Sequence, residues 1–243
     1  GSLGKHLLQQ AVQAGHEVTV LVRTPAKLPE ALRSRISVVQ ADLASIALTD
    51  LTAICSGQDA VINSAGLVTE GQAFIDLVDR LVSALEAIPA AQRPVCWFMA
   101  GAGLLDIDSS GRRGVDLPKV GTTYGPHRVN FERIRATDLD WRELCPGPMV
   151  ESPALGIGQL RISLDKLPVE LPAFLHKLPG VLVLPFFARR IPEMIVAYAD
   201  AAAVILANLE RSSPMSRHRV GLALPAGMRG KKDQWAKTAG SRA

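Results

Sequence analysis

The chain opens with the stretch GSLGKHLLQQAVQAGHEVTVLVR (residues 1–23), and this stretch decides the fold. Apolar residues recur at helical spacing between Leu3 and Val12, which predicts a helix with one buried face. Gly15 is suited to end that helix because glycine enters the left-handed conformation without a steric cost. The β-branched run at residues 18–22 then predicts a buried parallel strand.

Glycines lie at the start of the predicted helix, where a bound pyrophosphate would come close to the backbone. Phosphate oxygens approach main-chain N–H groups there, and a Cβ would block the approach. Gly1 is the close-approach glycine, and Gly4 lets the helix pack on the sheet. A Gly-x-x-Gly pair alone also fits a plain loop-to-helix start. The helix, Gly15 and the strand that follow at the right distances favour a dinucleotide-binding βαβ unit.

Strands and helices alternate along most of the chain. The expected strands cover residues 18–22, 36–43, 59–66, 94–101, 140–145 and 217–224. The expected helices cover residues 3–14, 26–32, 49–55, 74–88, 128–136 and 199–209. This alternation predicts an α/β fold with a Rossmann-type, doubly wound parallel sheet covered by helices on both faces.

Side chains at the ends of the predicted strands suit an adenine dinucleotide. Arg23 ends one strand, and a base there, helped by Lys27, suits a 2′-phosphate and favours NADP over NAD. A solvated surface arginine is the alternative. Asp42 ends the next strand and can accept a hydrogen bond from the adenine amino group, or it can serve as a turn or cap residue. The small pair Ala65-Gly66 leaves room for the ribose and pyrophosphate.

Composition divides the chain into four segments. Residues 1–150 form the expected NAD(P)-binding domain, and residues 151–192, rich in Pro and Leu without a sustained period, form a small substrate-side lobe. Residues 193–225 supply a helix and strand that complete the domain, and residues 226–243 form a basic, flexible tail.

The overall composition argues against several other functional classes. Hydrophobic content is 48% and charged content 21%, which is ordinary for a cytoplasmic globular protein, and no apolar run is long enough to span a membrane. The net charge of +4 comes without an aromatic-interleaved basic stripe, so nucleic acid is not the expected partner. Three widely spaced cysteines predict buried free thiols rather than a metal or disulfide site.

Residues 11–23 (AVQAGHEVTVLVR), 27–29 (KLP) and 57–62 (GQDAVI) resemble the atypical short-chain dehydrogenase/reductases. The closer similarity is to NmrA-like NAD(P)-binding proteins and to NADPH-dependent flavin/biliverdin-IXβ reductase. The resemblance implies a Rossmann-type sheet with NADP bound along the strand ends. By position, it implies that the cofactor is lined by Gly1, Ser2, Leu3, Arg23, Lys27, Asp42, Leu43, Ala65 and Gly66.

The glycine turn of this family is Gly-x-x-Gly-x-x-Gly behind a hydrophobic first strand, and this sequence starts at the second glycine. We therefore expect an N-terminally truncated sheet that lacks its first strand. Such a sheet would leave unpaired backbone groups, so we expect low stability or weak cofactor binding. Restoring an upstream strand should then rescue both properties.

The chain departs from the family at its catalytic positions. Classical members use a Ser after the fifth strand and a Tyr-x-x-x-Lys pair, but residues 99–103 (MAGAG) carry no hydroxyl. Counting back from residues 139–141 places His127 at the Lys position and Thr123 at the Tyr position. Counting from Tyr124 instead gives Tyr-x-x-x-Arg128, and the counts leave both alignments open. Pro126 fits poorly inside the helix that would carry these residues. Tyr124 and His127 are the candidate catalytic residues, with a helix-entry Tyr and a surface His as the alternative.

Two functions fit these observations. The first is an NADPH-dependent reductase that passes hydride to a flat acceptor such as a quinone or flavin, with the apolar lobe covering the ligand. The second is a non-catalytic NADP-binding redox sensor or scaffold of NmrA-like type, which would report to a protein partner. The absent Ser and the altered Tyr-x-x-x-Lys favour the sensor, whereas the apolar lobe favours the reductase, which we expect.

Overall fold

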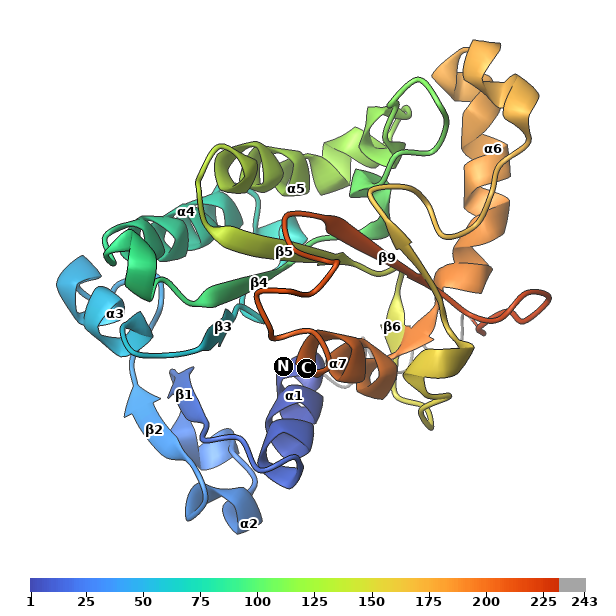
Figure 1. Cartoon of the computed structure of the whole chain (residues 1–243). Helices are drawn as coiled ribbons and strands as arrows, with labels where there is room; N and C mark the ends of the chain where they lie inside the picture. Colours follow the sequence, from blue (N-terminus) through green and yellow to red (C-terminus); the bar gives the residue numbers. More distant parts are fainter. Residues whose placement is uncertain (232–243) are drawn as a thin grey trace.

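A computed structural model describes residues 1–231; the end of the predicted basic tail, residues 232–243, lies outside the described residues. The main sheet has five strands in the order β3-β4-β5-β9-β7. Its strands are β3 (Ala60–Ile62), β4 (Val95–Met99), β5 (Asp140–Cys145), β9 (Arg219–Ala223) and β7 (Arg161–Leu164). The first four run parallel and β7 runs antiparallel to β9. The predicted Rossmann-type α/β fold, with a mostly parallel sheet, is confirmed (Figure 1).

Strands β1 (Thr19–Val22) and β2 (Ser37–Gln40) form a separate parallel pair. Within the described residues, no strand joins the free edge of β1 to that of β3. Residues 18–22 are predicted to form a buried strand; the strand is present, but the prediction that it is buried is wrong. Thr19 is exposed and the other residues of β1 are half-buried, because no strand covers the free edge of β1.

Helices cover both faces of the main sheet (Figure 1). On one face, α1 (Ser2–Gln13) packs along α7 (Tyr198–Leu206). On the other face, α3 (Leu48–Cys55), α4 (Gln72–Glu86) and α5 (Val120–Arg135) pack side by side. Strand side chains alternate between these layers: Trp97 packs with α1 and α7, whereas its neighbour Phe98 packs with α4 and α5.

Several elements differ from the sequence prediction. Helix α5 begins at Val120 and continues through Pro126, although the sequence predicts this helix only over residues 128–136. The predicted helix at residues 26–32 is broken into a 3-10 turn and the short α2 (Glu30–Arg33). Residues 151–192 contain β7 and the helix α6 (Gly180–Arg190). We keep the four-segment division as a proposal.

Short strands and 3-10 helices lie between the longer elements. Strands β6 (Met149–Val150) and β8 (Val196–Ala197) form a small parallel pair. The 3-10 helices are η1 (Pro25–Lys27), η2 (Val68–Glu70), η3 (Ala90–Gln92), η4 (Ala102–Leu104), η5 (Gly114–Asp116), η6 (Ile157–Gln159), η7 (Ala173–Lys177) and η8 (Ile191–Met194). No helix among residues 1–231 has the length and apolar character needed to cross a bilayer.

The predicted free cysteines are confirmed, and all three are buried. Burial raises the pKa of Cys55 to about 11 and that of Cys96 to about 12. It also raises the pKa of Cys145 well above its usual range. These thiols stay protonated at neutral pH and serve as small apolar core residues.

Strand β5 carries a carboxyl group in the centre of the sheet. Glu143 lies beside Phe98 of β4 and Arg219 of β9 in the strand register, and it is 1% exposed. Burial raises its pKa to about 8. Arg219 donates from Nη1 to the Leu104 carbonyl oxygen (2.7 Å) and to Asp106 Oδ1 (3.1 Å). The same arginine therefore ties the segment after β4 to β9.

Candidate active site

The glycine turn lies against the end of strand β3. Gly1 is the N-cap residue of α1, and the Lys5 N–H donates to its carbonyl oxygen (3.2 Å). A Cβ added to Gly4 would stand 3.1 Å from Ser64 Oγ, just beyond β3. Glycine at this position lets the helix N-terminus, with its partial positive charge, approach the strand end. The fold therefore brings the glycine turn and residues 64–66 together.

The segment after β3 is held by two hydrogen bonds of Asn63. Its backbone N–H donates to the Trp97 carbonyl oxygen (2.8 Å), and its side-chain Oδ1 accepts from the Ala65 N–H (3.0 Å). Gly66 follows in the left-handed region with φ 90°, and a Cβ there would lie 2.5 Å from the Phe74 ring. Glycine is thus required at position 66 by both conformation and space. Ala65 and Gly66 are exposed, so their backbone is accessible to a ligand.

Arg23, Lys27 and Asp42 lie at the carboxyl edge of the β1–β2 pair. The register pairs Val22 with Gln40, so Arg23 and Asp42 follow adjacent strand ends. Arg23 and Lys27 are exposed. Asp42 Oδ1 accepts from the Ala44 N–H (3.0 Å), so this carboxylate also makes the turn contact left open as an alternative from the sequence.

The remaining residues that the resemblance assigns to the cofactor are Ser2, Leu3 and Leu43. Ser2 is the first residue of α1, in its N-terminal turn. Leu3 is buried and packs in the core beneath α7. Leu43 is half-buried against the core below α3. The two leucine side chains therefore pack in the core.

His127 lies at the carboxyl end of β4. Its side chain is buried, and a Cβ on Gly101 would stand 3.4 Å from its Nε2. Gly101 therefore leaves room for the imidazole where classical relatives carry a serine. Burial lowers the pKa of His127 to about 4, so the ring is neutral at pH 7. Its Nδ1 has no hydrogen-bond partner among the described residues.

Aromatic rings flank His127 on two sides. The Tyr124 ring is nearly parallel to it, with 6.3 Å between centroids and 10° between planes. The Phe74 ring meets it edge-on, with 5.5 Å between centroids. Tyr124 is 42% exposed, whereas Phe74 is buried and also packs against Gly66. Phe74 therefore joins the segment after β3 to the pair Tyr124 and His127.

The rotation of α5 places His127 and Arg128, the two residues that counting offers for the Lys position, in different surroundings. Arg128, the alternative to His127, points to solvent and pairs with Asp116 (3.6 Å). His127 instead faces the strand end. The role of Tyr124 and His127 in catalysis remains a proposal.

Two side chains near this site were missed by sequence reasoning. Phe74 fits the inward face of the predicted helix at residues 74–88, so its periodicity marks it only as a core residue. Asn130 lies one turn after His127, is 4% exposed, and has no partner for Nδ2 among the described residues. A polar residue at a core position of a helix is a signal that could have identified it.

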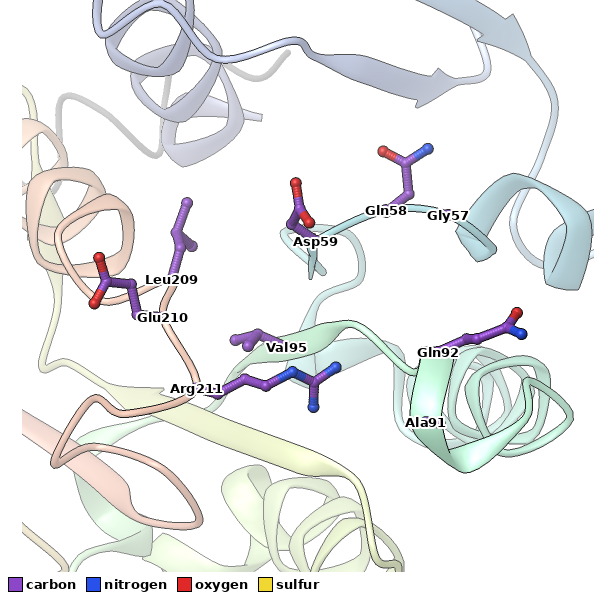
Figure 2. Close-up of a pocket in the computed structure, with 9 residues that line it drawn as sticks. All are labelled: Gly57, Gln58, Asp59, Ala91, Gln92, Val95, Leu209, Glu210 and Arg211. Carbon is purple, nitrogen blue, oxygen red and sulfur yellow. The ribbon is translucent and has the colours of Figure 1, made fainter.

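A cavity of about 570 Å³ lies elsewhere in the fold (Figure 2). It is lined by Gly57, Gln58, Asp59, Ala91, Gln92, Val95, Leu209, Glu210 and Arg211. Asp59 and Val95 stand at the amino ends of β3 and β4. The glycine turn and His127 lie at the carboxyl ends of these strands, where ligands bind in open α/β sheets. This cavity is therefore not the candidate active site. In residues 1–231, no group of His, Cys, Asp and Glu side chains is arranged to hold a metal ion.

Comparison with protein families identifies the class. Residues 1–166 match the family model described as NAD(P)H-binding. The chain belongs to this NAD(P)H-binding family. The match covers the glycine turn, the β1–β2 edge, His127 and strands β3 to β5, so the cofactor-binding family predicted from the sequence is confirmed.

Known proteins resemble the chain over almost its full length. A curated Bacillus subtilis relative, the uncharacterized protein YwnB, is 23% identical, with 86% of this chain and 88% of that protein covered. A short-chain dehydrogenase/reductase of Veillonella parvula in complex with NADP matches with a TM-score of 0.63 and 13% identity, covering 96% of this chain and 94% of the other. The anaerobilin reductase ChuY of Escherichia coli O157:H7 matches with a TM-score of 0.60 and 14% identity, covering 93% of each chain. These structures share the fold of this NAD(P)H-binding chain.

Proposed function

We propose that the protein is an NADPH-dependent reductase that transfers hydride to a flat acceptor such as a quinone or flavin. The observation that carries this proposal is the position of the neutral His127 ring and the exposed Tyr124 ring beyond Gly101. These rings stand beside the turn where the nicotinamide end of a dinucleotide is expected. A Veillonella parvula neighbour with this fold is in complex with NADP, which supports a dinucleotide as the cofactor.

The site fits the dinucleotide on the side of its phosphates. The N-terminus of α1 offers backbone N–H groups, and glycine at positions 4 and 66 lets Ser64 and Phe74 pack closely against these segments. NADPH, when bound, supplies the hydride. Arg23 and Lys27 are free to reach a 2′-phosphate because both are exposed at the β1–β2 edge. Their two positive charges are the reason to propose NADP rather than NAD.

The protein's own side chains would orient the acceptor. The ring of Tyr124 offers an exposed, planar surface on which a flat acceptor can stack. His127, neutral at pH 7, can hold one hydrogen bond through a ring nitrogen but is not a strong acid. A quinone or flavin accepts hydride readily, so positioning supplies most of the rate enhancement.

A non-catalytic NADP-binding sensor or scaffold is the second candidate. The observation that favours it is the strand end at residues 99–101, where the chain carries no hydroxyl beside His127. Such a protein would bind NADPH and signal its presence to a protein partner without turnover.

Steady-state oxidation of NADPH against a panel of quinones and flavins separates the two candidates. Turnover with at least one flat acceptor, absent without protein, supports the reductase. Tight NADPH binding in a calorimeter together with no oxidation across the panel would reject the reductase and leave the sensor.

A further inference from the structure

Helix α6 lies at the margin of the molecule (Figure 1). It carries part of a patch of exposed, large apolar side chains. The α6 patch consists of Phe174, Val181, Leu182 and Phe186, which are 57%, 61%, 52% and 40% exposed. Phe174, in η7, meets Phe186 edge-on, with 6.1 Å between ring centroids. Four large apolar side chains gathered on one short stretch indicate an interaction surface.

The opposite side of α6 is anchored to the body of the protein. Val183 and Phe187 are buried, and a Cβ on Gly114 would stand 3.1 Å from Phe187 Cζ. A Cβ on Gly180, the first residue of α6, would likewise stand 3.2 Å from Pro118 Cδ. The helix is thus held in place by its inner face, and the α6 patch is presented to whatever binds it.

Positive charge lies at both ends of the α6 patch. Between Glu170 and Glu193 the sequence holds three bases and no Asp or Glu. One of these bases, Arg190, pairs with Glu193 (3.0 Å). Lys177 and Arg189 are exposed at the two ends of the patch. Arg229 donates to the Arg189 carbonyl oxygen (3.0 Å), which adds a guanidinium group at the second end.

We propose that the α6 patch docks on the surface of an anionic lipid bilayer. A helix of 11 residues is about 16 Å long, too short to cross a bilayer but suited to lie in its interface. Apolar side chains enter the acyl boundary while the surrounding bases face lipid phosphates. A second copy of the chain is a poorer occupant, because a two-fold contact would bring the same bases together. The inference does not depend on which reaction the active site performs.

Flotation of the full-length protein with lipid vesicles tests the proposal. We expect binding to phosphatidylcholine vesicles in which about a third of the lipid is replaced by phosphatidylglycerol, and weaker binding without the anionic lipid or at high salt. Leu182→Ser and Phe186→Ser should each lower the partition coefficient about tenfold. Leu48→Ser, which changes an exposed apolar residue of α3 outside the patch, is the matched control.

The charged ends are tested separately. Lys177→Gln and Arg189→Gln should each weaken binding to the anionic vesicles about fivefold. Lys5→Gln, at an exposed position of α1, removes the same charge elsewhere and should have little effect. A Phe186→Trp variant should show a blue-shifted fluorescence that brominated lipids quench, which reports insertion even if a serine variant fails to fold.

Several results would overturn the inference. One is no binding of the wild-type protein to either vesicle type. A second is equal binding by the wild-type, Leu182→Ser and Phe186→Ser proteins. A third is a dimer in size-exclusion chromatography that both variants abolish while vesicle binding is absent, because it would assign the α6 patch to a second copy.

Discussion

The Tyr124 ring lies nearly parallel to the imidazole of His127, with 6.3 Å between the ring centroids. One member of the pair is exposed and the other is buried, so the tyrosine can meet a ligand while the histidine supports it. This arrangement predicts different effects for removing the tyrosine hydroxyl and for removing its ring.

Tyr124→Ala should lower kcat/KM for the best flat acceptor about tenfold, whereas Tyr124→Phe should stay within about threefold of the wild type. The reason is that the ring, rather than the hydroxyl, orients the acceptor in our proposal. Steady-state kinetics measures both variants, with Val129→Ala, at an exposed position of the same helix, as the control. Equal losses for the phenylalanine and alanine variants would instead assign proton donation to the hydroxyl.

His127 should make the protein sensitive to mild acid. Its pKa is about 4 in the fold and about 6.5 in the unfolded chain, so the unfolded state binds more protons between these values. The free energy of unfolding should therefore fall as the pH drops from about 6.5 to 4, by about 2–3 kcal/mol. Urea denaturation of the wild type and His127→Gln measures this contribution. In the variant, the free energy of unfolding should depend less steeply on pH between 6.5 and 4. An unchanged pH dependence would show that His127 does not cause the acid sensitivity.

Glu143 should make the protein less stable as the pH rises, the opposite of the effect of His127. Burial raises its pKa from 4.5 to about 8, so the folded state binds more protons between these values and stability falls as the pH rises through this window. Glu143→Gln keeps the shape of the neutral carboxyl and should raise the free energy of unfolding at pH 8 by about 4 kcal/mol, with little change at pH 4. Glu30→Gln, in the exposed α2, is the control. A destabilised Glu143→Gln protein at pH 8 would mean that the charged carboxylate supports the fold.

Gly66→Ala should destabilise the protein and weaken NADPH binding. The alanine would have to adopt φ 90°, and its Cβ would lie 2.5 Å from the Phe74 ring. We therefore expect the free energy of unfolding to fall by about 2–4 kcal/mol. Gly57→Ala is a matched control, because Gly57 has φ 77° with no atom within 4 Å of the new Cβ. It should cost only about 1 kcal/mol, since it adds strain without a clash. Thermal unfolding and NADPH titration compare the two variants. Equal losses of stability and of NADPH affinity in both would show that the Phe74 contact has no effect.

Cofactor selection should depend on Arg23. Arg23→Gln removes the charge proposed to hold the 2′-phosphate, so the Kd for NADPH should rise about tenfold or more while that for NADH stays constant. Fluorescence titration with both nucleotides supplies its own control. A parallel weakening of NADH binding would place Arg23 elsewhere on the dinucleotide.

Much of the fold was predictable from local patterns. The apolar spacing in α1 identified the residues that pack under α7, and Gly15 adopts the left-handed conformation expected beyond the helix. The predicted strand at residues 140–145 has the bounds of β5. In these elements, the residues that the apolar pattern predicts to be buried are the buried ones, because each element places its apolar side chains directly in the core.

Local patterns failed where packing overrides propensity. Pro126 suggested a boundary, but α5 continues through it, and the Thr122 residue that loses its backbone donor is exposed to water. Helix α6 contains Pro185 and was not predicted. It forms because Val183 and Phe187 are buried, the latter against the surface left open by Gly114.

The sequence by itself determined the alternation of strands and helices as far as β5, the glycine turn and the charged residues that follow β1 and β2. These features depend on spacing along the chain. Only the tertiary structure decided that His127 faces the end of β4 while Arg128 pairs with Asp116. That choice depends on the rotation of α5 about its axis, which is set by contacts with Phe74 and Gly101, residues distant in sequence. Spacing determines which residues share a helix face, but packing against other elements determines where that face points.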